Sequence, residues 1–292
     1  MILEILEIVA PVFLCAGVGY GWKRAKQPFD TALVTRLVSM IGAPCLIFST
    51  LVGIEQMAGD ILDMLLASLA AVAGFTLLST LALRALRLPL RTYLAALVFP
   101  NAGNMGLPLC LFAFGDVGLG LGIGYFAVTA TLNLTLGNWF YSGATMPWRA
   151  LKTPIPYAVA LGLVLMASGA APPEFLLKTT KLLGGIAIPM MMLSLGVSLA
   201  ELGITRPGRT LLLAALRFGI GLGVGYGIAL AFGFEGAQRG VMMIQSAMPV
   251  AVFNYLFAAL YKRNPEEIAS LVLISSALGF ASLPLLVYLA RL

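Results

Sequence analysis

Long apolar runs follow one another along the chain, and short segments that carry most of the charged residues separate them. A helix needs about 20 mostly apolar residues to cross a hydrocarbon core roughly 30 Å thick, and each run has about this length. The pattern predicts an all-α membrane protein with ten transmembrane helices, which we number as spans 1 to 10. They cover residues 3–22, 31–52, 61–83, 93–115, 118–142, 154–171, 179–201, 209–232, 238–260 and 267–290.

The composition favours lipid over water as the surrounding medium. Hydrophobic residues make up 60% of the chain and charged residues only 10%, and the mean hydropathy is +0.99. In soluble domains about a quarter of the residues are charged. The net charge of +6 comes from basic residues in short loops, where they set the orientation of the spans. We therefore expect membrane lipid as a partner, and no nucleic acid.

The basic residues are distributed unevenly between alternate loops. Odd-numbered loops hold most of them, beginning with Lys23, Arg24 and Lys26 between spans 1 and 2. Because basic segments resist translocation, these loops are expected to face the cytoplasm. With ten spans, both chain termini are then extracytoplasmic.

The two halves of the chain resemble each other at a constant shift of 145 residues. The shift pairs Pro11 with Pro156, Arg36 with Lys181, Pro44 with Pro189 and Ser49 with Ser194. It predicts two repeats of five spans each, over residues 1–146 and 147–292. An odd number of spans places the second repeat upside down in the membrane, the inverted-repeat plan of many secondary transporters.

Helix-breaking and polar residues collect in spans 4 and 9. Span 4 contains Pro100, Asn101, Gly103, Asn104, Gly106 and Pro108, and the shift places span 9, with Gln245, Pro249 and Asn254, opposite it. Proline removes a backbone donor, so both helices are expected to break, and the N-terminal ends of half-helices attract anions. We expect substrate-binding residues at Asn101, Asn104, Pro108, Gln245, Pro249 and Asn254. The alternative is that the prolines only kink two packed helices whose amides bond across the interface.

Two further polar positions accompany this site. Thr129 and Asn133 are four residues apart in span 5 and share a helix face, so they suit either a polar or sodium site or ordinary bonding between helices. Arg217 lies deep in span 8, where a charge is costly, and is a candidate counter-charge. It is expected either to face a cavity or to extend toward the cytoplasmic side.

The sequence argues against catalytic and metal chemistry. The chain has no histidine, and its three cysteines lie in different spans without a CxxC spacing, so we expect no metal and no cofactor. No pair of carboxylates is evident in mid-membrane, which argues against an enzyme and against cation antiport through an acidic residue. An anionic substrate held by amides and helix ends fits better.

The chain resembles the auxin efflux carrier family, which includes plant PIN-FORMED exporters and bacterial relatives, some associated with malate or malonate transport. The resemblance rests on the pattern Asn101, Gly106 and Pro108 and on the segment Gln245-Ser-Ala-Met-Pro249 followed by Phe257-Ala258. It implies crossed, broken helices 4 and 9, a transport domain of spans 3–5 and 8–10, a scaffold of spans 1, 2, 6 and 7, and a homodimer.

The resemblance also implies a site and a substrate class. In the plant exporters a span 4 asparagine and the crossover prolines frame the substrate carboxylate, which points to Asn101 and Pro108 here. In span 9 we expect Asn254 to replace the crossover proline, which argues against auxin itself. The expectation is an elevator-like carrier of small carboxylates in a bacterial inner membrane, coupled to a proton or sodium ion or to neither. A sodium-coupled organic anion symporter of the bile-acid type, which shares the crossed-helix fold, and a channel or sensor are the alternatives.

Overall fold

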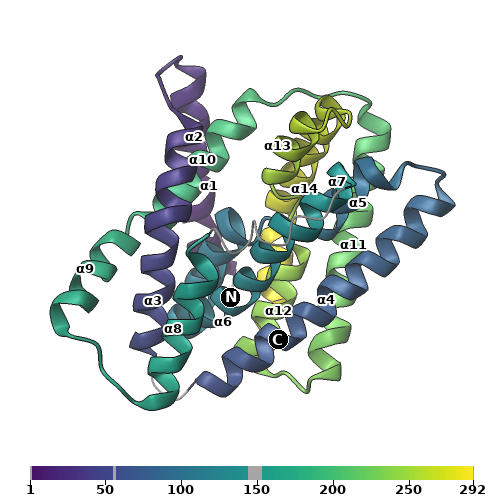
Figure 1. Ribbon diagram of the computed structural model, residues 1–292. Helices are drawn as coiled ribbons and strands as arrows, with labels where there is room; N and C mark the ends of the chain where they lie inside the picture. Colours follow the sequence, from purple (N-terminus) through teal and green to yellow (C-terminus); the bar gives the residue numbers. More distant parts are fainter. Residues whose placement is uncertain (1, 55–56, 144–152, 292) are drawn as a thin grey trace.

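The computed structural model describes residues 2–54, 57–143 and 153–291, and in this part of the chain every regular element is helical (Figure 1). The prediction of an all-α protein is confirmed. The first half forms α1 (Ile2–Arg24), α2 (Thr31–Leu37), the π-helical η1 (Val38–Gly42), α3 (Ala43–Gly53), α4 (Ala58–Ala85), α5 (Leu90–Val98), the π-helical η2 (Ala102–Gly106), α6 (Leu107–Leu132), the π-helical η3 (Asn133–Gly137) and α7 (Asn138–Ser142). The second half forms α8 (Ile155–Ser168), α9 (Glu174–Gly184), α10 (Ala187–Glu201), α11 (Pro207–Ala231), α12 (Gly236–Ala247), α13 (Phe253–Leu260) and α14 (Pro265–Arg291).

Seven helical stretches in the described residues are long and apolar enough to cross a membrane. The longest, Ala102–Ser142, joins the second part of predicted span 4 to all of span 5, and the chain turns within it at Gly115, whose φ is 63° and ψ is −152°. Helices α5, α8, α12 and α13 are each too short to be counted alone. The count of ten spans, the inverted repeat and the extracytoplasmic termini therefore stay predictions.

The helices pack as two sets, which lie on the left and right of Figure 1. Helices α1–α3 and α8–α10 contact one another most, with α1 lying along α10. Close approach of these two helices requires glycine, because a Cβ atom at Gly19 would lie 2.1 Å from the backbone oxygen of Leu193. An ion pair between Lys23 and Glu201 joins the ends of the same two helices. The second set consists of α4–α7 and α11–α14.

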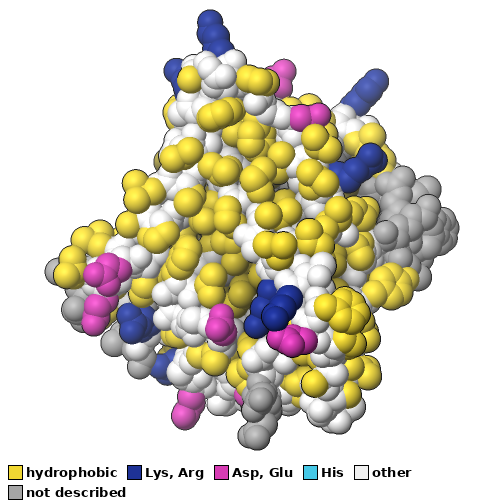
Figure 2. Space-filling model, turned by 90° about the vertical axis from the view of Figure 1, so that its left-hand side faces the viewer, with side chains coloured by type: hydrophobic (Ala, Val, Ile, Leu, Met, Phe, Trp, Pro, Cys, Tyr) yellow, Lys and Arg dark blue, Asp and Glu magenta, His cyan; other side chains and the backbone are white. Residues whose placement is uncertain are grey.

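The face of the molecule shown in Figure 2 is apolar over its middle. Figure 2 shows hydrophobic side chains across most of the visible face, with charged side chains toward its upper and lower parts. Large apolar side chains such as Leu3, Leu182 and Val164 are exposed. Lipid tails can cover such a surface, whereas water would leave it unstable.

Glu267 joins three helices at one end of the second set. It lies in the first turn of α14, and its carboxylate oxygens are 3.4 Å from Nη1 of Arg209 and 3.6 Å from Nη1 of Arg206. Arg209 also donates to the hydroxyl of Tyr93 in α5 at 3.4 Å. The Glu267 side chain is only 6% exposed, so this ion-pair cluster is screened less than a surface pair.

We expect Glu267→Gln to lower the unfolding temperature in detergent by about 2–6 °C, because the amide cannot balance the two guanidinium groups. The matched control is Glu174→Gln in α9, which removes an exposed pair with Lys178 and is expected to change the unfolding temperature by no more than about 1 °C. Equal shifts in the two variants would contradict this account of the cluster.

Candidate functional site

Two helix interruptions meet near the centre of the molecule and form a crossover. Helix α5 ends at Val98 and α12 ends at Ala247, and the following residues form an antiparallel bridge between Pro100 and Val250. The Asn101 N–H donates to the Pro249 oxygen at 2.7 Å, and the Ala251 N–H donates to the Phe99 oxygen at 3.2 Å. Each broken helix thus supplies partners for backbone groups that the other break has freed, as an apolar interior requires.

Proline explains why the chain leaves the helix at these points. Pro100 lies in the bridge and Pro249 directly precedes its partner Val250, and both prolines lack an N–H at points where the helical hydrogen bonds are already absent. Pro108 instead lies in the first turn of α6, a position that accepts proline readily. Of the two prolines in predicted span 4, Pro100 therefore lies in the break and Pro108 lies beyond it, since η2 begins at Ala102.

The residues that pair at the crossover differ from those that the constant shift of 145 between the two halves places opposite each other. The shift of 145 places Pro100 opposite Gln245, whereas Pro100 bridges with Val250. The reason is that α12 has 12 residues and α5 has 9, so the second break comes later in its repeat. As a result the span 9 crossover does contain a proline, Pro249, and Asn254 lies within α13. The expectation that Asn254 replaces the crossover proline was wrong.

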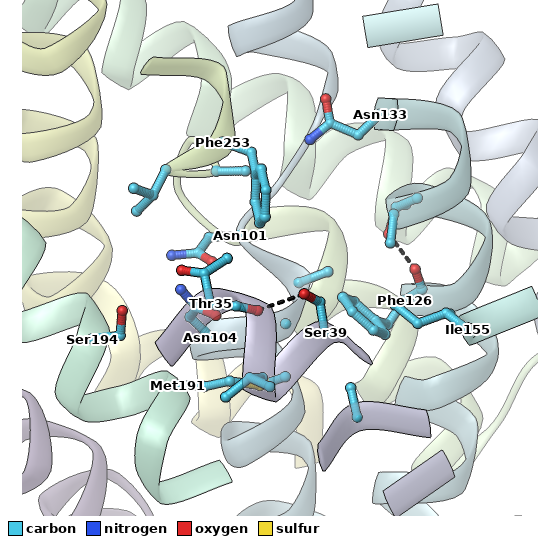
Figure 3. Close-up of a pocket in the computed structure, with 18 of the residues that line it drawn as sticks. Thr35, Ser39, Asn101, Asn104, Phe126, Asn133, Ile155, Met191, Ser194 and Phe253 are labelled. Carbon is cyan, nitrogen blue, oxygen red and sulfur yellow. Dashed lines mark hydrogen bonds between the residues drawn. The ribbon is translucent and has the colours of Figure 1, made fainter. Parts of the chain in front are cut away.

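A cavity of about 300 Å³ opens beside the crossover and lies between the two helix sets. One wall consists of the starts of the two half-helices that follow the breaks, Asn101–Asn104 before and within η2, and Ala251–Phe253 at the start of α13. The facing wall comes from α2, η1 and α10, and a third side comes from α6 and η3. Figure 3 shows Asn101, Asn104 and Thr35 in the middle of this pocket, with Ser194 and Met191 on the α10 side.

All three π-helical segments border the cavity. Val38–Met40 of η1, Ala102–Asn104 of η2 and Asn133–Leu134 of η3 belong to its lining. The wider turn is visible in the bond from the Gly106 N–H to the Asn101 oxygen, which spans five residues at 3.2 Å. Such segments interrupt the regular helix and are frequent at functional sites.

Of the eight predicted residues other than Arg217, the structure brings four to the cavity and keeps four away from it. Asn101, Asn104, Thr129 and Asn133 line it. The four residues that lie outside its lining are Pro108, Gln245, Pro249 and Asn254. Two of these have other contacts, since the Gln245 amide donates to the Gly122 oxygen at 3.3 Å and the Asn254 amide donates to the Ala251 oxygen at 3.2 Å.

The amides at the cavity differ in how far they are satisfied. Asn101 is 4% exposed, and its Nδ2 has no hydrogen-bond partner among the described residues. Asn133 is 8% exposed, and its Oδ1 likewise has no partner within the described part of the chain. Thr129 donates to the Tyr125 oxygen at 3.0 Å, which is a bond within its own helix. Asn101 Nδ2 and Asn133 Oδ1 are therefore buried polar atoms that the described residues leave without a partner, and a ligand that reaches them can satisfy both.

Arg217 belongs neither to the cavity lining nor to the surface. It is 1% exposed, and its Nη2 donates to the Ser246 oxygen at 2.9 Å. The side chain therefore neither reaches the surface nor lines the cavity beside the crossover. The described residues that line the cavity include no charged side chain.

The first helix set contributes a wall of the cavity that the sequence pattern does not predict. Thr35, Ser39 and Ser194 supply its hydroxyl groups, and Met191 and Phe253 add apolar surface. Thr35 and Ser39 are four residues apart, and the Ser39 hydroxyl donates to the Thr35 oxygen. Spacing of this kind is common in membrane helices, so it gave little signal by itself.

Comparison with known proteins agrees with a transport function. The membrane transport protein family matches residues 4–142 and 139–289. An uncharacterized transporter of Methanothermobacter thermautotrophicus is 27% identical over 88% of each chain. One of Methanocaldococcus jannaschii is 26% identical over 60% of each chain, so this match spans less than two thirds of that relative. Auxin efflux carrier component 1 of Arabidopsis thaliana is 26% identical over 44% of this chain and 22% of the plant protein.

Proposed function

Because this chain belongs to the membrane transport protein family of the auxin efflux carrier type, we propose that it is a secondary carrier of a small organic anion, a carboxylate. The substrate binds in the cavity beside the crossover and crosses the membrane by alternating access. No catalytic step is part of this proposal, and neither a metal nor a cofactor is needed for it.

The observation that carries the proposal is the orientation of two helix ends toward one cavity. The half-helices η2–α6 and α13 both begin at its lining, at Ala102 and Phe253. The first N–H groups of a helix have no partner within the helix, and the end carries a partial positive charge. Two such ends in one cavity, whose described lining residues carry no charge, favour an anion in the manner of broken-helix transporters.

Side chains at the cavity complete a carboxylate site. The free Nδ2 of Asn101 can donate to a carboxylate oxygen, and the neighbouring Asn104 amide and Thr35 hydroxyl can supply further bonds. The rest of the lining is largely apolar, including Phe126, Met191 and Phe253. A volume of about 300 Å³ suits a small organic ion.

The position of the cavity between the two helix sets supports an elevator-like movement. We propose that the set α4–α7 and α11–α14 carries the substrate, while the set α1–α3 and α8–α10 is the scaffold and the contact between two copies in a homodimer. A ten-span inverted repeat with extracytoplasmic termini, in a bacterial inner membrane, belongs to the same proposal. Movement of one set past the other would expose the cavity to each side in turn.

A sodium-coupled organic anion symporter is the second candidate, favoured by one observation. The buried Oδ1 of Asn133 has no partner among the described residues and lies near Thr129 on the lining, so it offers an oxygen ligand to a cation. The coupling ion, a proton or sodium, is therefore part of the test.

We expect purified protein in liposomes to take up at least one member of a carboxylate panel, consisting of acetate, malate, malonate, benzoate and auxin. Uptake should saturate and show counterflow, because a carrier binds its substrate in each cycle. Parallel measurements with sodium replaced by potassium, and with an imposed pH gradient, identify the coupling ion. Uptake that never saturates would indicate a channel, and absence of uptake for the whole panel would overturn the proposed substrate class.

A further inference from the structure

Arg217 is a buried charge that the cavity alone does not explain. Among the described residues no carboxylate pairs with it, and its Nε and Nη1 have no hydrogen-bond partner there. Its guanidinium carbon lies 4.9 Å from the centre of the Phe75 ring, which adds a cation–π contact. Burying an unpaired charge is costly, so a role that requires the charge is the simplest reason for its presence.

The guanidinium lies at the C-terminal end of the broken helix α12. Its hydrogen-bond acceptor, the Ser246 oxygen, is in the last turn of that helix, which ends at Ala247. The last carbonyl groups of a helix have no partner within it and carry a partial negative charge. In broken-helix transporters such ends coordinate the coupling cation. Here a side chain of the protein occupies that position.

The packing of α11 against α12 fixes this arrangement. Gly221 and Gly225 follow Arg217 at one and two turns and share its helix face. A Cβ atom at Gly221 would lie 2.4 Å from the Ser246 oxygen, and one at Gly225 would lie 2.7 Å from the Ser246 Cβ. The two glycines let α11 approach the end of α12 more closely than any side chain would permit, so the guanidinium is held against it.

The Arg217 charge is linked to the proposed substrate site through the interruption that follows α12. Ala251, which lines the cavity, follows Ser246 by five residues along the same interruption. The cavity lining contributes no charge of its own among the described residues. In an apolar interior a nearby fixed positive charge attracts an anion far more strongly than it would in water.

We propose that Arg217 is a built-in cation of the crossover. Its guanidinium neutralises the partial negative charge at the end of α12, as a bound sodium ion does in ion-driven carriers. Its positive charge also favours an anion in the cavity beside the crossover, and this second part rests on the proposed function. The α12 end then requires no dissolved cation, and the positive charge stays with the crossover through every transport cycle.

The first test measures cation dependence of unfolding and needs no substrate. Arg217→Ala, in detergent, is titrated with low-millimolar guanidinium chloride against N-methyl-D-glucamine chloride at equal ionic strength. We expect guanidinium to raise its unfolding temperature by about 3 °C or more once it reaches roughly ten times its dissociation constant. Wild-type protein and the control Arg239→Ala, which removes an arginine of α12 itself, should show no such rise. If Arg217→Ala does not fold, Arg217→Gln undergoes the same titration with sodium chloride added as a third salt.

The second test measures transport. Arg217→Met keeps the length of the side chain and is expected to raise the KM of the transported carboxylate roughly tenfold, while Arg217→Lys keeps most of the affinity. A purely structural role would affect both variants through stability and leave KM unchanged. If no cation raises the unfolding temperature of Arg217→Ala or Arg217→Gln, Arg217 does not replace a bound ion. If the KM of Arg217→Met is unchanged, its charge does not favour the anion in the cavity. If wild-type protein transports no carboxylate, the proposed function fails, and the cation titration still decides whether Arg217 replaces a bound ion.

Discussion

Replacing Asn101 by alanine is expected to lower carboxylate uptake into proteoliposomes by roughly tenfold to a hundredfold, the loss of one hydrogen bond to a charged group. The reason is that the Asn101 Nδ2 is buried at the cavity and has no partner among the described residues. The protein should remain folded, because the contact that ties Asn101 to the crossover is its backbone N–H, which donates to Pro249 and is kept in alanine. The backbone of Asn101, with φ −76° and ψ 56°, avoids the left-handed region.

The matched control is Asn254→Ala. Asn254 is a fully buried amide close to the second break, but it lies outside the cavity and bonds to the Ala251 oxygen. Its removal is expected to lower the unfolding temperature with little change in KM. Normal uptake in Asn101→Ala would exclude the site described here. Equal losses of uptake in two folded variants would show that the crossover, and not its free amide, determines transport.

Gly19→Ala is expected to destabilise the first helix set severely. An added Cβ would lie 2.1 Å from the Leu193 oxygen of α10, and this atom belongs to the backbone, so it cannot rotate away as a side chain could. Helix α1 must then separate from α10 along much of their shared length. We expect a loss of roughly 2–4 kcal/mol in the free energy of unfolding, the upper range for an overpacked interior. The measurement is thermal unfolding in detergent followed by size-exclusion chromatography.

Gly17→Ala provides the control on the same helix. A Cβ atom at Gly17 has nothing within 4 Å, so the substitution changes only backbone freedom. Alanine favours the helix over glycine by about 1 kcal/mol, and Gly17→Ala is expected to be neutral or stabilising. If Gly19→Ala were equally well tolerated, the close contact between α1 and α10 would not be required for folding.

The general plan could be predicted from the sequence because it depends on local signals. Apolar runs of membrane length predict helices without any knowledge of their neighbours, and proline at mid-membrane predicts an interruption. Pro100 and Pro249 do lie in the two breaks, and Asn101 and Asn104 do line the cavity beside them.

The remaining features depend on contacts between distant segments. Helix α12 has 12 residues and α5 has 9, so the constant shift of 145 between the halves does not give the bridge of Pro100 with Val250. Thr35 and Ser194 come from unremarkable apolar helices that reach the cavity only through the arrangement of the two helix sets. The depth of Arg217 in its span can be predicted from the sequence, but its hydrogen-bond acceptor cannot. The acceptor is the backbone oxygen of Ser246, and every residue has a backbone oxygen.

The three π-helical segments have a consequence for insertions and deletions. A π-helical turn holds one more residue than an α-helical turn, so removing one residue from η1, η2 or η3 can return the segment to a regular α-helix. Elsewhere in a helix a deletion turns every later side chain by about 100°. All three segments border the cavity, so the helix positions that best tolerate the loss of a single residue are positions that shape the binding site. A sequence alignment that allows no gap within helices would therefore misplace the residues of η1, η2 and η3 in relatives that lack one of them.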